Sequence, residues 1–192
     1  LIYSVNFQQF VDWQHRGEWA QADRAMAAAL NGLHRAGASF GLIATNTMHI
    51  VFDEVQAEAA MPLISIVDAT AGAIREARLG CVGLLGTVFT MRERFFIDGL
   101  RRSGIDALVP DTAAQDHMNH IIYNELCRGE IRPESRQLFQ QVIEKLQMQG
   151  ARGIILGCTE IPLLVRPEDS PLPLFNTSTI HAESALRRAI GS

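Results

Sequence analysis

The chain has 192 residues, of which 47% are hydrophobic and 20% charged, and its formal net charge is −4 at pH 7. A chain of this length can bury a sizeable core, as one large domain or two small ones, and the composition is ordinary for a globular protein. The acidic balance, the few aromatic residues and the lack of a basic run argue against nucleic-acid binding. No apolar run approaches the ~20 residues that a membrane-spanning helix requires.

The first residues, Leu1 to Phe7, form an apolar run without a start methionine, a charged leader region or a cleavage site. This pattern is not that of a signal peptide. We therefore expect the chain to begin inside a longer protein, with a strand over residues 1–5.

Short apolar runs bounded by turn residues alternate with segments of helical periodicity along the chain. The predicted strands are 1–5, 41–45, 63–67, 81–86, 106–109, 153–157 and 172–175. The predicted helices are 18–36, 68–78 with Asp68 as its N-cap, 90–103, 113–128, 133–149 and 178–190 opening on Ser178. Strands that alternate with helices predict an α/β protein with a parallel sheet.

The cysteines and histidines offer little sign of a metal site. The chain has three cysteines, Cys81, Cys127 and Cys158, and no Cys-x-x-Cys pair. The odd number and the spacing argue against a disulfide framework and against a zinc site, and they favour a reducing cytoplasm. His117 and His120 are spaced to share a helical face, but a polar helix start explains them better than a metal pair.

Two segments of the chain share one construction. Aligning Gly37-Ala38 with Gly150-Ala151 places Thr45 opposite Cys158, and each of these two residues closes an apolar run and precedes two polar residues. Ligand sites in parallel sheets lie beyond the carboxyl ends of the strands, so a hydroxyl and a thiol are expected to face one cleft.

A third predicted strand ends in Gly80-Cys-Val-Gly-Leu-Leu-Gly-Thr87. Its glycine spacing differs from the dinucleotide-binding fingerprint, and no acidic ribose partner follows about twenty residues later. A tight turn beside a ligand and plain packing are both compatible with this run.

Cys158 is the residue in the sequence that is best suited to take part in a reaction. A strand-end loop that leads into a helix offers N–H groups and a positive dipole end, so we expect the pKa of this thiol to be lowered. The thiolate would then act as a general base, or as a nucleophile with His49 or His181 as its partner. The alternative is that Cys158 is a small buried hydrophobic residue.

The two strand-end segments resemble the signatures of the aspartate/glutamate racemases, in the wider Asp/Glu/hydantoin racemase superfamily. Thr45-Asn-Thr-Met-His49 is similar to the first signature and Gly157-Cys-Thr-Glu-Ile161 to the second. Segments of the same kind extend the resemblance over essentially the whole chain: Ser4–Phe7, Gln14, Arg16–Trp19, Leu84–Thr87, Thr90-Met91 and Ile180–Glu183.

The resemblance implies two flavodoxin-like α/β domains, one of residues 1–78 plus 177–192 and one of 79–176, with the site between them. It implies a cytoplasmic homodimer, a small-molecule substrate, no metal and no cofactor, and racemisation by two bases on opposite faces of Cα. Neither nucleic acid nor membrane is an expected partner.

The chain departs from the family pattern in three places. Thr45 stands where the first catalytic cysteine usually lies, as in the L-aspartate/glutamate-specific racemases, so Cys158 is expected to deprotonate L-glutamate or L-aspartate while the Thr45 side reprotonates. The opening βα unit of the family, whose Gly-rich turn adds a substrate contact, has no counterpart in the residues given, and we expect it either to be absent or to precede them. Cys127 aligns with a lysine that binds a substrate carboxylate in many aspartate racemases, and Arg128 is a weak candidate to replace it.

The remaining site residues are assigned to substrate binding. Asn46, Thr47 and Thr159 are expected to donate hydrogen bonds to the α-carboxylate, which suits an anion near helix N-termini. Glu160 would receive the ammonium group, and Gln14 matches a substrate-contact position of the family. Two further functions remain open: a single-cysteine decarboxylase or isomerase of the same superfamily, and a degenerate module that binds acidic amino acids.

Overall fold

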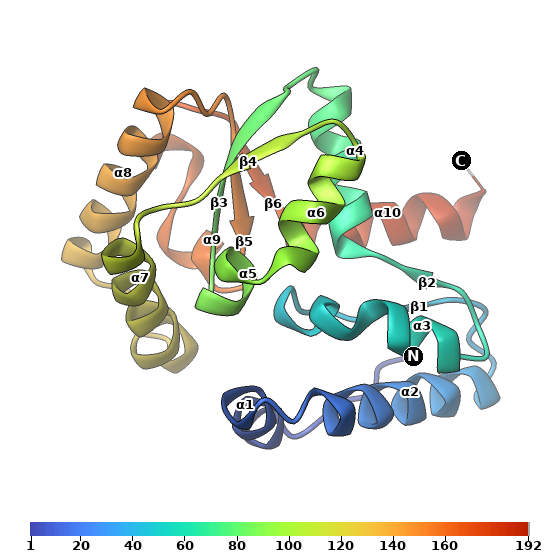
Figure 1. The fold of residues 1–192 in the computed structure, drawn as a ribbon. Helices are drawn as coiled ribbons and strands as arrows, with labels where there is room; N and C mark the ends of the chain where they lie inside the picture. The colour runs from blue at the N-terminus through green and yellow to red at the C-terminus, as the bar shows by residue number, and fades with distance from the viewer. Residues whose placement is uncertain (192) are drawn as a thin grey trace.

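A computed structural model describes residues 1–191, which form an α/β protein with two parallel sheets (Figure 1), as predicted. The strands are β1 (Gly41–Leu42), β2 (Leu63–Ile64), β3 (Cys81–Gly86), β4 (Asp106–Leu108), β5 (Ile154–Gly157) and β6 (Leu174–Asn176). The α-helices are α1 (Phe7–Arg16), α2 (Trp19–Arg35), α3 (Phe52–Glu58), α4 (Ile66–Glu76), α5 (Val88–Arg92), α6 (Arg94–Arg102), α7 (Thr112–Asn124), α8 (Pro133–Met148), α9 (Ile161–Leu164) and α10 (Thr177–Ile190). Short 3₁₀ turns are η1 (Thr47–Val51), η2 (Leu126–Arg128) and η3 (Pro167–Asp169).

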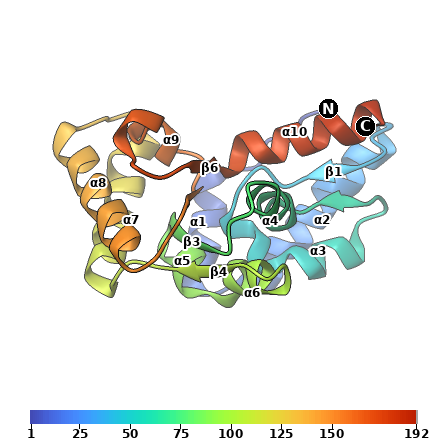
Figure 2. The same cartoon turned by 90° about the horizontal axis from the view of Figure 1, so that it is seen from above.

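The larger sheet has the strand order β4-β3-β5-β6 and forms the middle layer of the molecule. One face packs against α7, α8 and α9, and the other packs against α4 and α6 (Figures 1 and 2). Because both faces are covered, the central strands β3 and β5 are continuous apolar runs rather than alternating ones.

The smaller sheet pairs β1 with β2 and packs with α1, α2 and α3 around a separate apolar cluster. These helices lie together at the bottom of the view in Figure 1. Helix α4 follows β2 in the chain but packs in the core of the larger sheet, where Ile66 and Ile74 are buried with Phe96 and Phe175. The division into domains 1–78 plus 177–192 and 79–176 stays a prediction.

A pair of glycines allows β3 and β5 to approach closely at their carboxyl ends. Gly86 and Gly157 are paired in register, and a Cβ atom on Gly157 would lie 2.7 Å from the Leu85 carbonyl oxygen. A Cβ atom on Gly86 would lie 2.9 Å from the Gly157 carbonyl oxygen. The glycines therefore fix the spacing of the strand ends immediately before Thr87 and Cys158.

Three predicted elements differ from the observed ones. Residues 1–5 are exposed and irregular, because no strand within residues 1–191 pairs with them. The predicted helix 90–103 is two helices with an extended Glu93 between them, so that α5 stays against β3 while α6 turns its apolar face onto α4. The predicted helix 113–128 ends at Asn124 and continues as the turn η2.

Helix ends account for most of the other differences. Ser65, rather than Asp68, caps α4 by accepting the Asp68 N–H at 3.1 Å, and Asn176, rather than Ser178, caps α10. Helices α1, α3 and α9 were not predicted. A cap at Asn6 and a left-handed Gly17 bound α1 and were readable in the sequence.

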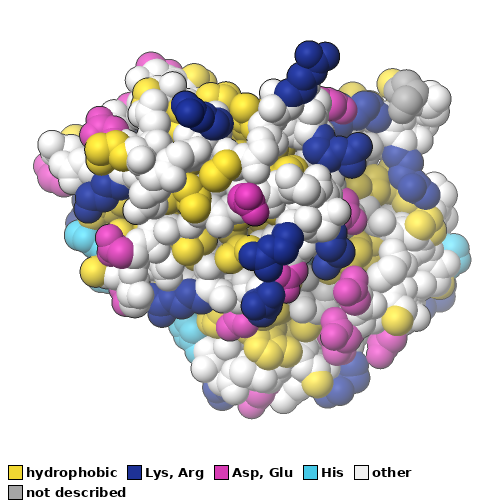
Figure 3. Space-filling model, turned by 45° about the horizontal axis from the view of Figure 1, so that its top comes forward, with side chains coloured by type: hydrophobic (Ala, Val, Ile, Leu, Met, Phe, Trp, Pro, Cys, Tyr) yellow, Lys and Arg dark blue, Asp and Glu magenta, His cyan; other side chains and the backbone are white. Residues whose placement is uncertain are grey.

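The surface carries no large area of one charge on the face drawn in Figure 3, where basic and acidic side chains are interspersed with apolar ones. Within residues 1–191, no helix combines the length and apolar character that crossing a membrane would require. These observations agree with the composition.

Gly157→Ala is expected to destabilise the protein by about 1–3 kcal/mol, because the added methyl group meets a backbone carbonyl that cannot rotate away. Gly72→Ala is the matched control, since its Cβ has no neighbour within 4 Å in α4, and it should stabilise by about 0.5–1 kcal/mol. Urea denaturation measures both changes. Equal stability of the two variants would contradict the close approach of β3 and β5.

Candidate functional site

A cavity of about 860 Å³ lies beyond the carboxyl ends of β1 and β5. Every site residue predicted from the sequence lines it: Gln14, Thr45, Asn46, Thr47, Cys158, Thr159 and Glu160. The structure therefore brings together side chains that are more than one hundred residues apart in the chain. The two strand-end segments that share a construction contribute the two halves of one site.

Thr47 and Thr87 connect the first half-site to the larger sheet. Both side chains are buried, and their hydroxyl oxygens lie 3.1 Å apart. Thr87 also caps α5 by accepting the Thr90 N–H at 3.3 Å. The glycine-containing run 80–87 was compatible both with plain packing and with a turn beside a ligand. In the structure, Thr87 at its end lines the cavity.

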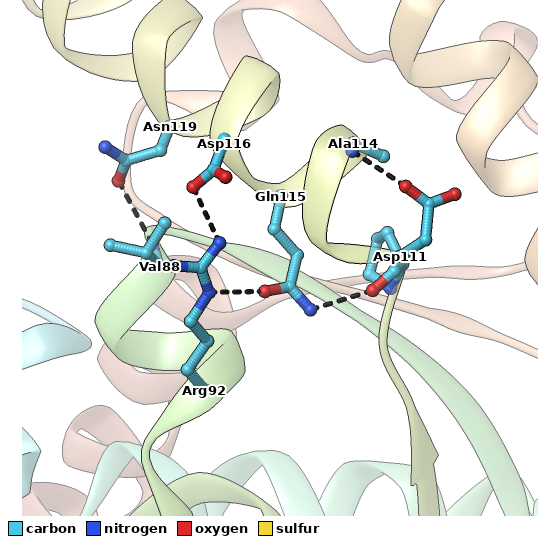
Figure 4. Close-up of polar contacts among 8 residues, drawn as sticks. Val88, Arg92, Asp111, Ala114, Gln115, Asp116 and Asn119 are labelled. Carbon is cyan, nitrogen blue, oxygen red and sulfur yellow. Dashed lines mark hydrogen bonds and ion pairs between the residues drawn. The ribbon is translucent and has the colours of Figure 1, made fainter.

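A polar network holds α5, the helix that Thr87 caps, against α7 (Figure 4). The Arg92 Nε donates to Gln115 at 2.8 Å, Arg92 also pairs with Asp116 at 2.6 Å, and the Asn119 oxygen accepts the Val88 N–H at 3.1 Å. The first residue of α5 is thus tied to α7, which carries other residues of the cavity.

Asn46 is joined to the carboxyl end of β5 through Thr177. The Thr177 hydroxyl donates to the Leu156 carbonyl at 2.9 Å, so its oxygen accepts the Asn46 Nδ2–H at 3.0 Å. This chain fixes the orientation of the Asn46 amide. Its Oδ1 atom is buried without a hydrogen-bond partner among residues 1–191, so Asn46 offers an acceptor to a ligand as well as the second N–H of its amide.

Glu160 is the charged side chain nearest to the thiol. Its Oε2 atom accepts from the Cys158 Sγ at 3.0 Å and from the Thr159 hydroxyl at 2.6 Å. The Thr159 hydroxyl proton is therefore used by Glu160, and only the backbone N–H of Thr159 remains for an anionic ligand. Cys158 is 8% exposed, so its thiol opens onto the cavity from a largely buried position.

The expected lowering of the Cys158 pKa is wrong for the ligand-free site. Burial raises the pKa of Cys158 well above its ordinary value, and the negative charge and hydrogen bond of Glu160 raise it further, although a backbone hydrogen bond from Glu160 opposes them. Helix α9 has four residues and begins only at Ile161, so it provides little dipole at the sulfur. The thiol is therefore protonated near neutral pH.

His49 supports the Thr45 loop from behind. Its Nε2 accepts the Ile66 N–H at 3.0 Å, so Nδ1 carries the proton and donates to the Thr45 carbonyl at 2.8 Å. Burial lowers the pKa of His49 to about 3, and the ring is neutral. His181 donates to the Ile64 carbonyl at 2.7 Å. With both rings bonded to backbone and outside the cavity lining, the arrangement disfavours Cys–His nucleophilic chemistry.

Gln14 and the residues of α7 and η2 complete the wall. Gln14 is buried and its Nε2 lies 3.3 Å from the Met48 sulfur. Tyr123 and Cys127 also line the cavity, and burial raises the pKa of Tyr123 to about 12 and that of Cys127 to about 11. Arg128 lies outside the lining, which does not support it as a replacement for the missing lysine.

Two residues of the site were missed in the sequence. Thr177, which supports Asn46 from outside the cavity lining, follows the carboxyl end of β6 and was detectable by the strand-end rule that identified Thr45 and Cys158. Tyr123 reaches the cavity from the last turn of a helix, where periodicity alone does not separate a cavity residue from a packed one. Within residues 1–191, no group of three or more His, Cys, Asp or Glu side chains is arranged to hold a metal ion.

The fold and the site define a parallel α/β protein with a strand-end cavity for a small molecule. Comparison with known sequences identifies the family, because a model of the Asp/Glu/Hydantoin racemase family matches residues 1–185. The chain belongs to this family.

Individual relatives agree with this assignment. A proposed Asp/Glu racemase from Yersinia pestis is 41% identical, with a TM-score of 0.91 over 99% of this chain and 83% of that one. An aspartate racemase homologue from Pyrococcus horikoshii OT3 is 34% identical, with a TM-score of 0.86 over the same shares. The broad specificity amino-acid racemase RacX of Bacillus subtilis (strain 168) is 25% identical over 85% of this chain and 72% of its own. The chain spans about half the length of several curated glutamate racemases that it matches.

The buried His49 should make stability depend on pH. Its pKa is lowered in the folded state, so the unfolded chain binds more protons below pH 6.5 and stability falls as pH falls toward 3. The slope from one such group is about 1.4 kcal/mol per pH unit. His49→Gln should flatten the dependence between pH 6 and 5, measured by urea unfolding, whereas the exposed His117→Gln should not. Identical slopes in both variants would rule out a neutral buried His49.

Glu160→Gln should lower the pKa of Cys158, because it removes the adjacent negative charge while burial remains. A fall of one pKa unit raises the thiolate fraction about tenfold. The measurement is the rate of iodoacetamide alkylation of Cys158 at pH 8, followed by mass spectrometry of its peptide. Glu183→Gln, on the exposed side of α10, is the control and should leave the rate unchanged. No acceleration in the Glu160 variant would refute the coupling.

Proposed function

We propose that this protein is an amino acid racemase that works without a cofactor, with Cys158 as the base and the Thr45 side as the proton donor. The observation that carries the proposal is the placement of these two residues at the ends of β5 and β1, in the wall of one cavity. Membership of the racemase family supports the same reaction.

The polar groups of the cavity suit the two ends of an amino acid. The Glu160 carboxylate and the unpaired Asn46 Oδ1 are acceptors, which fits the three N–H donors of an α-ammonium group. In this proposal, the Thr47 hydroxyl and the backbone N–H of Thr159, which both belong to cavity-lining residues, donate to the α-carboxylate. Gln14 also lines the cavity, and in this proposal it contacts the remainder of the substrate.

Cys158 and Thr45 account for the protons that move in the proposed reaction. An ammonium group beside Glu160 offsets the charge that raises the pKa of Cys158, so the thiolate forms at lower cost when substrate is bound. The thiolate takes the Cα proton of the L-enantiomer, and the electron pair of the broken C–H bond moves into the carboxylate. The Thr45 hydroxyl, or a water that it positions, gives a proton to the opposite face and regains one from solvent. The Cys158 thiol releases the proton that it took to solvent, which restores the starting state.

Thr45 and Cys158 differ in acidity, so the L-to-D and D-to-L directions of the proposed reaction have unequal rates. A hydroxyl is far less acidic than a thiol, so Thr45 is a poor base toward the D-enantiomer. We propose that L-amino acids are deprotonated much faster than D-amino acids. L-Glutamate and L-aspartate are the first substrates to test, because the resemblance implies them, and the name of the RacX relative justifies a wider panel.

The proposal includes a homodimer in the cytoplasm, as the family resemblance implies. Its assembly is measurable by light scattering of the purified protein. Neither a metal nor a nucleotide takes part in the proposed reaction.

The direct test is exchange of the Cα proton in D₂O, followed by NMR on a panel of L- and D-amino acids. Cys158→Ala should abolish exchange, with a loss of at least about a hundredfold, the scale of a positioned acid–base group. Cys81→Ala removes a thiol from outside the cavity lining and should retain exchange. Equal initial rates from the two enantiomers would contradict the assigned roles.

Other outcomes of that experiment identify the alternatives. Binding of an amino acid without exchange would support a binding module instead of an enzyme. Release of CO₂ from a substituted malonate, dependent on Cys158, would support a single-cysteine decarboxylase.

A further inference from the structure

Glu125 is a buried acidic residue that the proposed reaction does not use. It is 7% exposed, and the hydroxyl of Ser135, which is also buried, donates to its Oε2 atom at 2.5 Å. The half-exposed Arg132 lies 3.6 Å from the other carboxylate oxygen. Removing a carboxylate from water is costly unless hydrogen bonds replace its hydration, so the Ser135 hydroxyl is the buried group that holds this side chain in place.

The backbone of Glu125 ends α7 and begins η2. Its carbonyl accepts the N–H groups of Arg128 at 2.9 Å and of Glu130 at 3.0 Å, which closes the turn. Tyr123 precedes this junction and Cys127 follows it, and both line the cavity. A contact that fixes the Glu125 side chain therefore fixes the junction between two segments of the cavity wall.

The residue after Ser135 contacts the segment that carries the thiol. The Arg136 Nε donates at 2.8 Å to the carbonyl of Leu164, the last residue of α9. Helix α9 follows the cysteine segment directly, and the Ile161 N–H donates to the Cys158 carbonyl at 3.3 Å. Leu164 is fully buried in the apolar cluster that contains Cys158. Arg136 thus holds the far end of the Cys158 segment.

We propose that the first turn of α8 is a positioning element for the reaction. Ser135 holds η2 through Glu125, and the adjacent Arg136 holds the Cys158 segment through α9. Helix α9 also packs against η2, so the two segments that the turn holds are neighbours. Neither Ser135 nor Arg136 lines the cavity, and both act on the site through the residues that they bind. This inference rests on the proposed racemase function.

The two contacts should affect different kinetic constants. Release of η2 moves part of the cavity wall and leaves the thiol in place, so it should weaken substrate binding more than it slows the chemical step. Release of α9 moves the thiol relative to the substrate Cα. A displacement of about 1 Å between reacting groups can cost roughly a hundredfold in rate, so this release should lower kcat.

The kinetic test is Cα exchange in D₂O with the L-amino acid that exchanges fastest. Ser135→Ala should raise KM about threefold or more, the scale of one hydrogen bond, with a smaller change in kcat. Arg136→Ala should lower kcat about tenfold or more, with a smaller change in KM. Glu125→Gln keeps an oxygen acceptor for the Ser135 hydroxyl and should retain the original KM. Glu130→Gln, which changes an exposed carboxylate of the same loop, is the control.

Alkylation of the cysteines reports both positions without a substrate. Burial raises the pKa of Cys127 to about 11 and that of Cys158 well above its ordinary value, so either thiol should react faster once its segment is released. Ser135→Ala should speed iodoacetamide alkylation of Cys127, and Arg136→Ala that of Cys158. Each change should be about threefold or more, which corresponds to half a pKa unit. Cys81 lies outside the cavity lining and should keep its rate.

The outcomes separate this inference from the proposed function. Faster alkylation of all three cysteines would indicate general loosening and would overturn the inference, as would equal effects of the two variants on KM and kcat. If Ser135→Ala does not fold, Glu125→Ala breaks the same hydrogen bond without leaving a buried carboxylate, and Cys127 must then react faster in that variant. Lack of exchange with every amino acid would overturn the racemase function, and the alkylation rates alone would then decide whether α8 holds the two segments.

Discussion

The hydrogen bond from Asn46 to Thr177 is the contact on which the geometry of the site depends. Asn46 belongs to the loop after β1, Thr177 begins α10, and the Thr177 hydroxyl continues to the carbonyl of Leu156 in β5. One short chain of polar groups thus connects the two sheets within one residue of Thr45 and two residues of Cys158. Together with the Thr47–Thr87 contact, it joins the two parts of the molecule whose apolar clusters pack separately.

Glu160 determines how charge is distributed around the thiol. Glu160 accepts hydrogen bonds from both Cys158 and Thr159, and after burial it is the next cause of the raised pKa of the thiol. In the proposed reaction, Cys158 would stay protonated until an ammonium group reaches Glu160, which would protect the thiol from reaction with other electrophiles. Its activation would then be coupled to the binding of the substrate.

The parallel α/β class and the meeting of Thr45 and Cys158 at one cavity could be predicted from the sequence, because both rest on short-range patterns. Apolar runs closed by Thr45 and Cys158 are visible without knowledge of the packing, and parallel strand ends meet at one edge of a sheet. The raised pKa of Cys158 was not predictable, since it depends on burial and on the side-chain conformation of Glu160. The break between α5 and α6 at Glu93 was not predictable either. No helix-breaking residue marks it, and it follows from the packing of α6 on α4.

The histidine behind the Thr45 loop has a consequence for how a ligand is bound. Because the His49 ring is neutral and bonded on both nitrogens to the backbone, it joins the Thr45 carbonyl to the first turn of α4 with no freedom to rotate. The loop is thereby held in one conformation by bonds within the protein. Such preorganisation means that little conformational entropy is lost on binding, so even a small ligand with few contacts can be held with useful affinity.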